Sequence, residues 1–136
     1  MRTFVLRLQD ARGHEQIDDV ESFVGVDESG SFGLLAGHER FMTSLVFGLA
    51  RFRREAGPWE YLALPGALVY FADDQLILST RRYFRDADYG RISGQLMDRL
   101  AAEEKDLEAI QQSLKRLEGE MLKRLWEMGR GREGRL

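Results

Sequence analysis

The sequence predicts a β-plus-α fold, in which an N-terminal antiparallel β-sandwich is followed by a long C-terminal helix or helical hairpin. Before Asp86, apolar residues come in short alternating runs interrupted by glycines, which is the period of strands. After Asp86, apolar residues recur every three or four positions as far as Met128, which is the period of a helix. Turn signals about every eight to twelve residues in the first part are typical of a sandwich or a barrel.

Eight segments of the first part have the composition of strands. The first alternates cleanly, with Phe4, Leu6 and Leu8 on one face. The others are short apolar or alternating runs bounded by turn residues, and the acidic pairs 18–19 and 73–74 are expected in such turns. The expected strands cover residues 3–8, 20–26, 31–35, 41–47, 49–54, 59–64, 67–71 and 76–79.

The second part carries an apolar stripe from residue 88 to residue 128. A continuous helix of this length would extend about 60 Å. Even half-burial of its side chains is worth on the order of 10 kcal/mol, so the stripe is expected to be covered. It either folds back as a hairpin on itself or the sandwich, pairs with another copy, or docks on a partner coiled coil. Its members follow heptad spacing: Leu96, Leu100, Leu107, Ile110, Leu114, Leu117, Met121 and Met128.

These patterns divide the chain into a β-sandwich at residues 1–85, a coiled-coil-like helical arm at residues 86–128 and a flexible basic tail at residues 129–136. The arm is acidic between Asp98 and Glu108 and basic from Lys115 to Arg135. Such charge runs indicate either a solvated helix face or a surface that steers docking.

Composition excludes several classes of function. A net charge of −3 and a pI near 5.5 argue against nucleic-acid binding. No apolar run is long enough to insert into a membrane, and we expect no secretory signal. With two histidines and no cysteine, the chain offers no spacing suited to a nucleophile, a metal centre or a disulfide. We therefore expect no catalytic residues, no metal, no cofactor and no enzymatic activity.

The segment from Gly30 to Gly48 reads GSFGLLAGHERFMTSLVFG. It resembles the signature of the epsilon subunit of F-type ATP synthases, a family with a β-sandwich followed by a helical C-terminal part. This chain departs from that signature at Ser31, Ala36 and Phe47, where the family has an acid and two prolines. The residues that match in register are Phe32, Gly33, Leu34, Leu35, Gly37, His38, Thr43, Leu45 and Gly48.

The C-terminal part is similar to one branch of that family. The common bacterial form ends in an alanine-rich helical hairpin. Here the residues 79–82, the leucine-rich arm and the ending at residues 123–129 resemble the epsilon subunit of the alternate, N-type ATPases.

The resemblance implies a rotor subunit in the central stalk. The sandwich would link the gamma subunit to the c ring in ion-transport-linked ATP synthesis, peripherally at the cytoplasmic face of the bacterial plasma membrane. The implied partner interface comprises Ser31, Phe32, Leu35, His38, Phe41 and Met42. The arm would extend along gamma and inhibit ATP hydrolysis by the alpha and beta subunits. The arm residues expected to act there are Leu107, Leu114, Lys115, Arg116, Met121, Lys123 and Arg124.

Two of these interpretations have structural alternatives. Alternating apolar residues at Phe32 and Leu34 would also arise if one strand face were simply core, and His38 beside a turn would also suit a hydrogen-bonded surface group. Some epsilon relatives bind ATP through an Ile/Leu-Asp-x-x-Arg-Ala motif. Asp88 and Arg91 keep its spacing, whereas both flanking positions differ, which argues against ATP binding. The rival function is a non-enzymatic β-sandwich adaptor that homodimerises through its C-terminal heptads.

Overall fold

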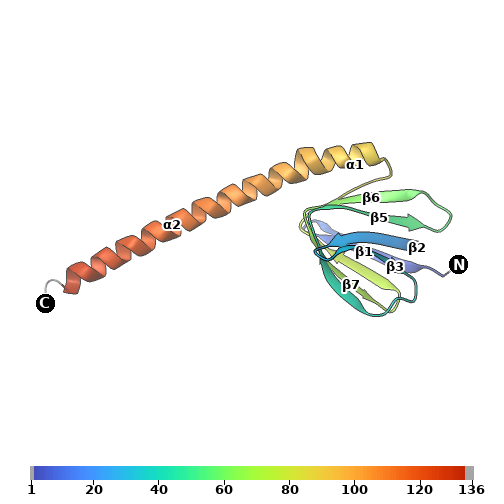
Figure 1. Ribbon diagram of the computed structural model, residues 1–136, viewed down its shortest axis with the longest axis horizontal. Helices are drawn as coiled ribbons and strands as arrows, with labels where there is room; N and C mark the ends of the chain where they lie inside the picture. The colour runs from blue at the N-terminus through green and yellow to red at the C-terminus, as the bar shows by residue number, and fades with distance from the viewer. Residues whose placement is uncertain (1, 134–136) are drawn as a thin grey trace. The chain divides into compact units, whose positions relative to one another are not determined.

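The computed structural model describes residues 2–133, which form nine strands, two α-helices and a π-helical segment (Figure 1). The strands are β1 Phe4–Asp10, β2 Gly13–Asp27, β3 Gly30–Leu35, β4 Phe41–Leu45, β5 Gly48–Arg54, β6 Trp59–Leu64, β7 Ala67–Ala72, β8 Gln75–Ser79 and β9 Phe84–Asp86. The helical elements are α1 Tyr89–Gln95, the π-helical segment Leu96–Leu100 and α2 Ala101–Glu133.

The strands follow the order β4-β7-β8-β1-β2-β5-β6-β9, and β3 pairs with β2. Strand β2 serves both layers of the sandwich, because its first half pairs with β1 and its second half lies between β3 and β5. The pairing partner of β2 changes from β1 to β3 and β5 around Asp19, which has a φ of 58°. Register shifts beside Val20 occur at the same place. In Figure 1, β5 and β6 lie on one side of β2 and β7 on the other.

The predicted antiparallel β-sandwich is confirmed, with corrections of detail. Strands β1 and β8 pair in parallel, whereas the other pairs are antiparallel. Strand β2 begins at Gly13 rather than at residue 20, because its first half is mostly polar and exposed yet still pairs with β1. The three-residue strand β9 was not predicted. Strand β4 ends at Leu45 rather than at residue 47.

The main core lies between the two layers of strands. Four phenylalanines at its centre, Phe4, Phe23, Phe52 and Phe71, are at most 2% exposed. The rings of Phe4 and Phe71 meet edge to face with their centroids 5.4 Å apart. Aliphatic side chains from β1, β6, β7 and β8 pack around these rings, as the strand alternation predicts: Leu6, Leu8, Leu62, Leu64, Val69, Leu76 and Leu78. Strands β2, β3 and β4 add Val20, Leu34 and Leu45.

A second, smaller core lies on the other face of β6. Ala63 points away from the main core, and Ile92 of α1 and Leu100 of the π-helical segment are buried against it. The small alanine side chain allows the helical backbone to approach the strand closely. The first compact unit therefore runs to Ala101, beyond the boundary expected at residue 85, because the start of the helical arm packs on the sandwich.

The second compact unit begins at Ala102 and contains most of α2. This element is a long helix rather than a hairpin, and it includes residues 129–133 of the expected flexible tail. The rest of that tail, residues 134–136, lies outside the described residues. Among the helices of residues 2–133, none combines the length and apolar content needed to cross a membrane.

Candidate partner interface

The predicted interface begins on β3, whose side chains alternate between the core and solvent. Leu34 is buried and Phe32 is half-buried, with its ring 5.2 Å from that of Phe41. Ser31 and Leu35 point the other way and are exposed. Leu34 is therefore a core residue and Phe32 is partly one, which is the structural alternative considered for them from the sequence. Ser31 and Leu35 are available to a partner.

The loop after β3 presents His38 at the surface. The imidazole ring meets Phe41 and Phe71 edge-on, with centroids 5.6 and 5.9 Å away, and its Nδ1 lies 2.8 Å from the carbonyl oxygen of Glu39. These contacts fit the surface-group interpretation of His38, while its exposure leaves it accessible to a partner.

Asp74 holds this loop in place, although the sequence indicated only a turn there. Its carboxylate accepts a hydrogen bond of 2.6 Å from the backbone N–H of Gly37 and one of 2.8 Å from Arg2. Gly37 has a φ of 84°, a conformation that favours glycine. The Gly37 hydrogen bond, followed by the Arg2 guanidinium, lowers the pKa of the Asp74 carboxyl. One side chain thus joins the N-terminus, the β3–β4 loop and the β7–β8 turn.

An apolar patch on the outer face of β4 and β7 extends the predicted interface. Met42 is 71% exposed and lies opposite Tyr70, and Leu68 on the same face is 63% exposed. Ile77 of β8 continues the row beside Tyr70. Only Met42 was predicted. The continuous apolar run of β7 indicates this patch, because a strand with apolar residues on both faces packs on the core with one face and can pack on another surface with the other.

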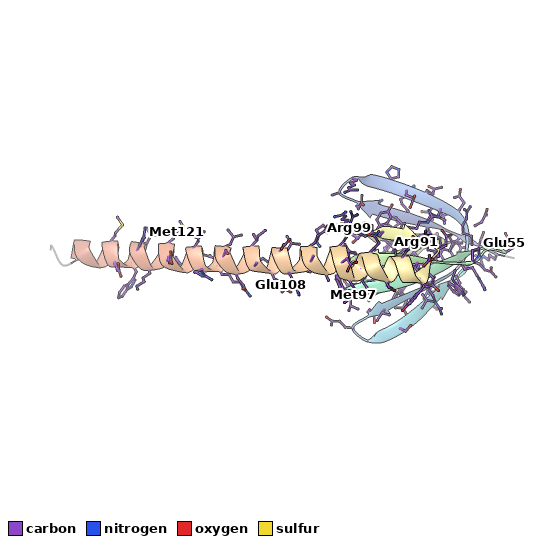
Figure 2. The ribbon with its side chains drawn as sticks, turned by 90° about the horizontal axis from the view of Figure 1, so that it is seen from above. Glu55, Arg91, Met97, Arg99, Glu108 and Met121 are labelled. Atoms are coloured by element: carbon purple, nitrogen blue, oxygen red, sulfur yellow. The ribbon has the colours of Figure 1, made fainter. Side chains whose placement is uncertain are left out.

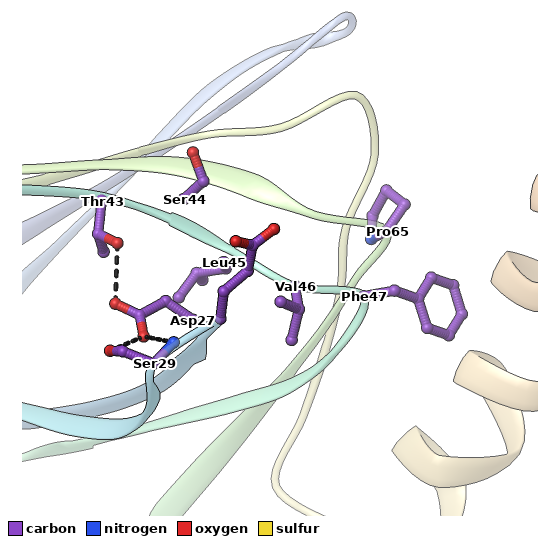
Figure 3. Close-up of a pocket in the computed structure, with 9 residues that line it drawn as sticks. Asp27, Ser29, Thr43, Ser44, Leu45, Val46, Phe47 and Pro65 are labelled. Carbon is purple, nitrogen blue, oxygen red and sulfur yellow. Dashed lines mark hydrogen bonds between the residues drawn. The ribbon is translucent and has the colours of Figure 1, made fainter.

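A hollow of about 710 Å³ lies at one end of the sandwich (Figure 3). Asp27 is fixed there, since one carboxylate oxygen accepts hydrogen bonds from Ser29 and the other accepts one of 2.8 Å from the Thr43 hydroxyl. The Ser29 and Thr43 hydroxyl groups lower the pKa of the Asp27 carboxyl. The exposed apolar side chains of Val46 and Phe47 line the same hollow as the Asp27 carboxylate. Neither residue was predicted from the sequence to lie at a surface for partners.

Asp88 and Arg91, the candidates for ATP binding, are engaged in starting helix α1. The Asp88 carboxylate accepts a hydrogen bond of 3.0 Å from the Arg91 backbone N–H, as an N-cap does. The Arg91 guanidinium pairs with Asp86 at 3.0 Å, and Asp86 also accepts a hydrogen bond from the Asp88 backbone N–H. The Asp88 backbone N–H and the Arg91 side chain lower the pKa of the Asp86 carboxyl. Both candidates thus have local roles, and ATP binding stays a prediction.

The predicted inhibitory residues lie on α2, whose side chains stand out along its length, with Glu108 and Met121 labelled in Figure 2. Leu107 is half-buried. The other six are exposed, namely Leu114, Lys115, Arg116, Met121, Lys123 and Arg124. Leu122 and Trp126 add exposed apolar area outside the heptad stripe. Within residues 2–133, no three histidine, aspartate or glutamate side chains converge as metal ligands would.

A small sandwich with exposed apolar patches and a solvent-exposed amphipathic helix has the surfaces of a binding subunit. Comparison with known proteins identifies its family. The model of the ATP synthase delta/epsilon chain β-sandwich domain matches residues 6–86. This chain belongs to that family, and the resemblance to epsilon subunits is confirmed; the N-type branch stays a prediction.

A curated relative and two solved structures agree with this family. The ATP synthase epsilon chain 2 of Cereibacter sphaeroides is 32% identical over 98 residues, which cover 71% of this chain and 62% of the relative. A chain in the Euglena gracilis mitochondrial ATP synthase has a TM-score of 0.56 at 19% identity, over 71% of this chain and 62% of the other. A chain from the central stalk and c ring of the Tetrahymena thermophila mitochondrial ATP synthase has a TM-score of 0.52 at 13% identity, over 61% of this chain and 66% of the other. At these identities the two structures show the fold alone.

Proposed function

We propose that this chain is a central-stalk rotor subunit of an F-type ATP synthase, in which the sandwich links the gamma subunit to the c ring. The family match over residues 6–86 carries this proposal. It is supported by the two solved structures, which come from assemblies described as containing a c ring. Because this chain spans 62% of its curated relative, its partners are part of the proposal.

The exposed surfaces of the sandwich suit two different contacts. The apolar outer face around Met42 and Leu68 would pack on another protein surface, because exposed apolar patches mark interaction sites. The β3–β4 loop, with His38 at its surface and Asp74 holding its backbone, offers a fixed polar contact. We assign the Ser31–Met42 edge to the contact with the c ring and gamma, as the resemblance implies.

We propose that α2 docks on gamma and inhibits ATP hydrolysis. The exposed stripe through Leu114 and Met121 supports docking, since such a stripe gains free energy when a partner covers it. The exposed basic side chains of Lys115, Arg116, Lys123 and Arg124 suit acidic segments of the alpha and beta subunits. In this role the chain is a regulatory, non-catalytic subunit. Its location would be peripheral, at the cytoplasmic face of the bacterial plasma membrane.

The test is the ATPase activity of a catalytic alpha-beta-gamma complex after addition of the full-length chain. The Lys123→Glu/Arg124→Glu variant reverses two charges on α2 and should bind but inhibit less. Lys105→Glu is the matched control, because it reverses an exposed charge on the same helix outside the proposed inhibitory residues. It should inhibit like the unmodified chain.

A truncated chain ending at Ala101 separates binding from inhibition. It keeps α1 and the π-helical segment packed on Ala63, which a chain ending at Asp86 would lose. We expect this truncated chain to bind without inhibiting. Binding of the full chain without inhibition would leave a coupling subunit with a passive arm. Failure to bind gamma would refute the rotor proposal and favour the adaptor.

A further inference from the structure

The outer face of the layer that contains β4, β7, β8 and β1 carries a row of side chains that crosses all four strands. The strand pairings place Tyr70 between Met42 and Ile77. Ile77 in turn lies beside Arg7, and Arg7 lies opposite Gln16 of β2. These five residues are called the Arg7 row below. The row begins in the apolar patch of β4 and β7 and reaches a cation.

Arg7 is the one charged side chain in this part of the face. One neighbouring row starts with Ser44 and Leu68 and the other with Ala72, and both hold only uncharged side chains as far as β1. The start of the helical arm packs on β6 of the other layer, and Met42 and Leu68 stay exposed. Exposed apolar patches mark interaction sites, and the cores of protein interfaces are depleted of charged residues. A single arginine in such a face therefore needs an explanation.

The guanidinium group of Arg7 has one polar contact with the residues that the structure describes. Its Nη2 donates a hydrogen bond of 3.3 Å to Oε1 of Gln16. Nε2 of Gln16 donates one of 3.1 Å to Asp18, so that carboxylate is bonded to the amide and not to Arg7. Among residues 2–133 no carboxylate forms an ion pair with Arg7. Most of its five N–H donors are thus left to solvent.

A partner that covers this face must remove water from Arg7. Burying a guanidinium group without a counter-charge is strongly unfavourable, whereas a carboxylate can accept two of its N–H groups at once. We propose that the Arg7 row is a docking surface for the gamma subunit, and that gamma brings an apolar surface with one carboxylate placed against Arg7. This inference rests on the proposed function and adds a chemical requirement to it. A surface with a base at that position would be rejected.

Competition for the catalytic alpha-beta-gamma complex tests this proposal, with labelled unmodified chain and unlabelled full-length variants. Arg7→Leu removes the charge and adds apolar area, so it separates charge pairing from apolar packing. It should bind about 10–100-fold more weakly, because the carboxylate of the partner loses its counter-charge. Arg7→Lys keeps the charge and should lose less binding than Arg7→Leu, although a lysine cannot form the two parallel hydrogen bonds. Leu68→Glu should also weaken binding, because it places an unpaired charge in the apolar part of the face.

Arg51→Leu is the matched control. Arg51 is also an exposed strand arginine without an ion pair among the described residues, and its Cζ lies 4.3 Å from the centroid of the Trp59 ring. It belongs to β5 in the other layer, outside the Arg7 row. This variant should compete like the unmodified chain.

The outcomes separate this inference from the proposed function. If the unmodified chain does not bind, the rotor proposal fails and this inference fails with it. If the unmodified chain binds and Leu68→Glu competes equally well, gamma uses another surface, which overturns this inference alone. Binding of Arg7→Leu as tight as that of the unmodified chain, or tighter, would show that the contact needs only apolar area and would overturn it too. So would equal weakening in Arg7→Leu and Arg51→Leu.

Discussion

Gly25 lies in β2 with its Cα facing the core, and replacing it with alanine tests how tightly the two layers are packed. A Cβ atom at this position would lie 2.8 Å from the Leu45 Cδ2 atom and 3.0 Å from both Phe23 Cε1 and Phe32 Cζ. Carbon atoms prefer separations of about 3.5–4.0 Å, so the new methyl overlaps three side chains. Leu45 can adjust at its flexible end, whereas the fully buried Phe23 cannot.

Two effects of the substitution oppose each other. Alanine lowers the entropy of the unfolded chain relative to glycine and so favours folding by roughly 0.5–1 kcal/mol. Overpacking of a dense core costs about 1–3 kcal/mol. Because two of the three close contacts are with aromatic rings, we expect the overpacking to dominate. The free energy of unfolding of Gly25→Ala should fall by about 1–2 kcal/mol in urea denaturation.

Gly33→Ala is the control, because Gly33 lies in the adjacent strand and a methyl group there has room. The nearest atom to a Cβ at this position is the Phe23 carbonyl oxygen at 3.8 Å, an ordinary contact. This variant should match the unmodified chain or exceed its stability slightly. Equal stability of Gly25→Ala and the unmodified chain would refute the packing argument, as would equal losses in both variants.

Two further predictions concern the second core and the Asp74 contacts. Ile92→Ala should cost about 2–5 kcal/mol and release α1, because it opens a cavity against Ala63; hydrogen exchange should accelerate in α1 and the π-helical segment, whereas the exposed Met97→Ala should have little effect. For Asp74, the folded-state pKa is lowered from 3.8, so its stabilising contribution is complete above that value and is lost as pH falls through the folded pKa. Asp74→Asn should therefore lose less stability than the unmodified chain between about pH 7 and pH 3 in urea titrations; an identical pH dependence would contradict this account.

The strand period of the first part allowed most of the sandwich to be predicted. Strand β6 has the predicted bounds, because its alternation and its flanking glycine and proline signals agree. The first half of β2 was missed, since Ile17 is its one buried apolar residue before Val20 and polar side chains fill the other positions. Strand β9 is too short to produce a period, and its pairing with β6 depends on long-range contacts.

The candidate interface was predicted less completely, for a physical reason. In β3 and β4 the apolar residues occupy both strand faces, so sequence alone cannot separate the half-buried Phe32 and Phe41 from the exposed Leu35 and Met42. Leu68 was missed because the apolar residues of β7 form a continuous run, which has no alternation to separate its buried face from its exposed one. The anchoring role of Asp74 depends on contacts 37 and 72 residues away along the chain.

The π-helical segment has a consequence for helical phase. In a regular α-helix each residue turns by about 100°, so Leu100 would lie about 80° away from Ile92 after two full turns. The wider winding reduces that rotation, and the Ala101 backbone N–H donates to the Leu96 carbonyl oxygen five residues earlier. Both side chains are thereby aligned on one face and reach β6 together. Without the π-helical segment, the rotation per residue of a regular α-helix would turn Leu100 away from β6. With it, Ile92 and Leu100 pack on the same strand.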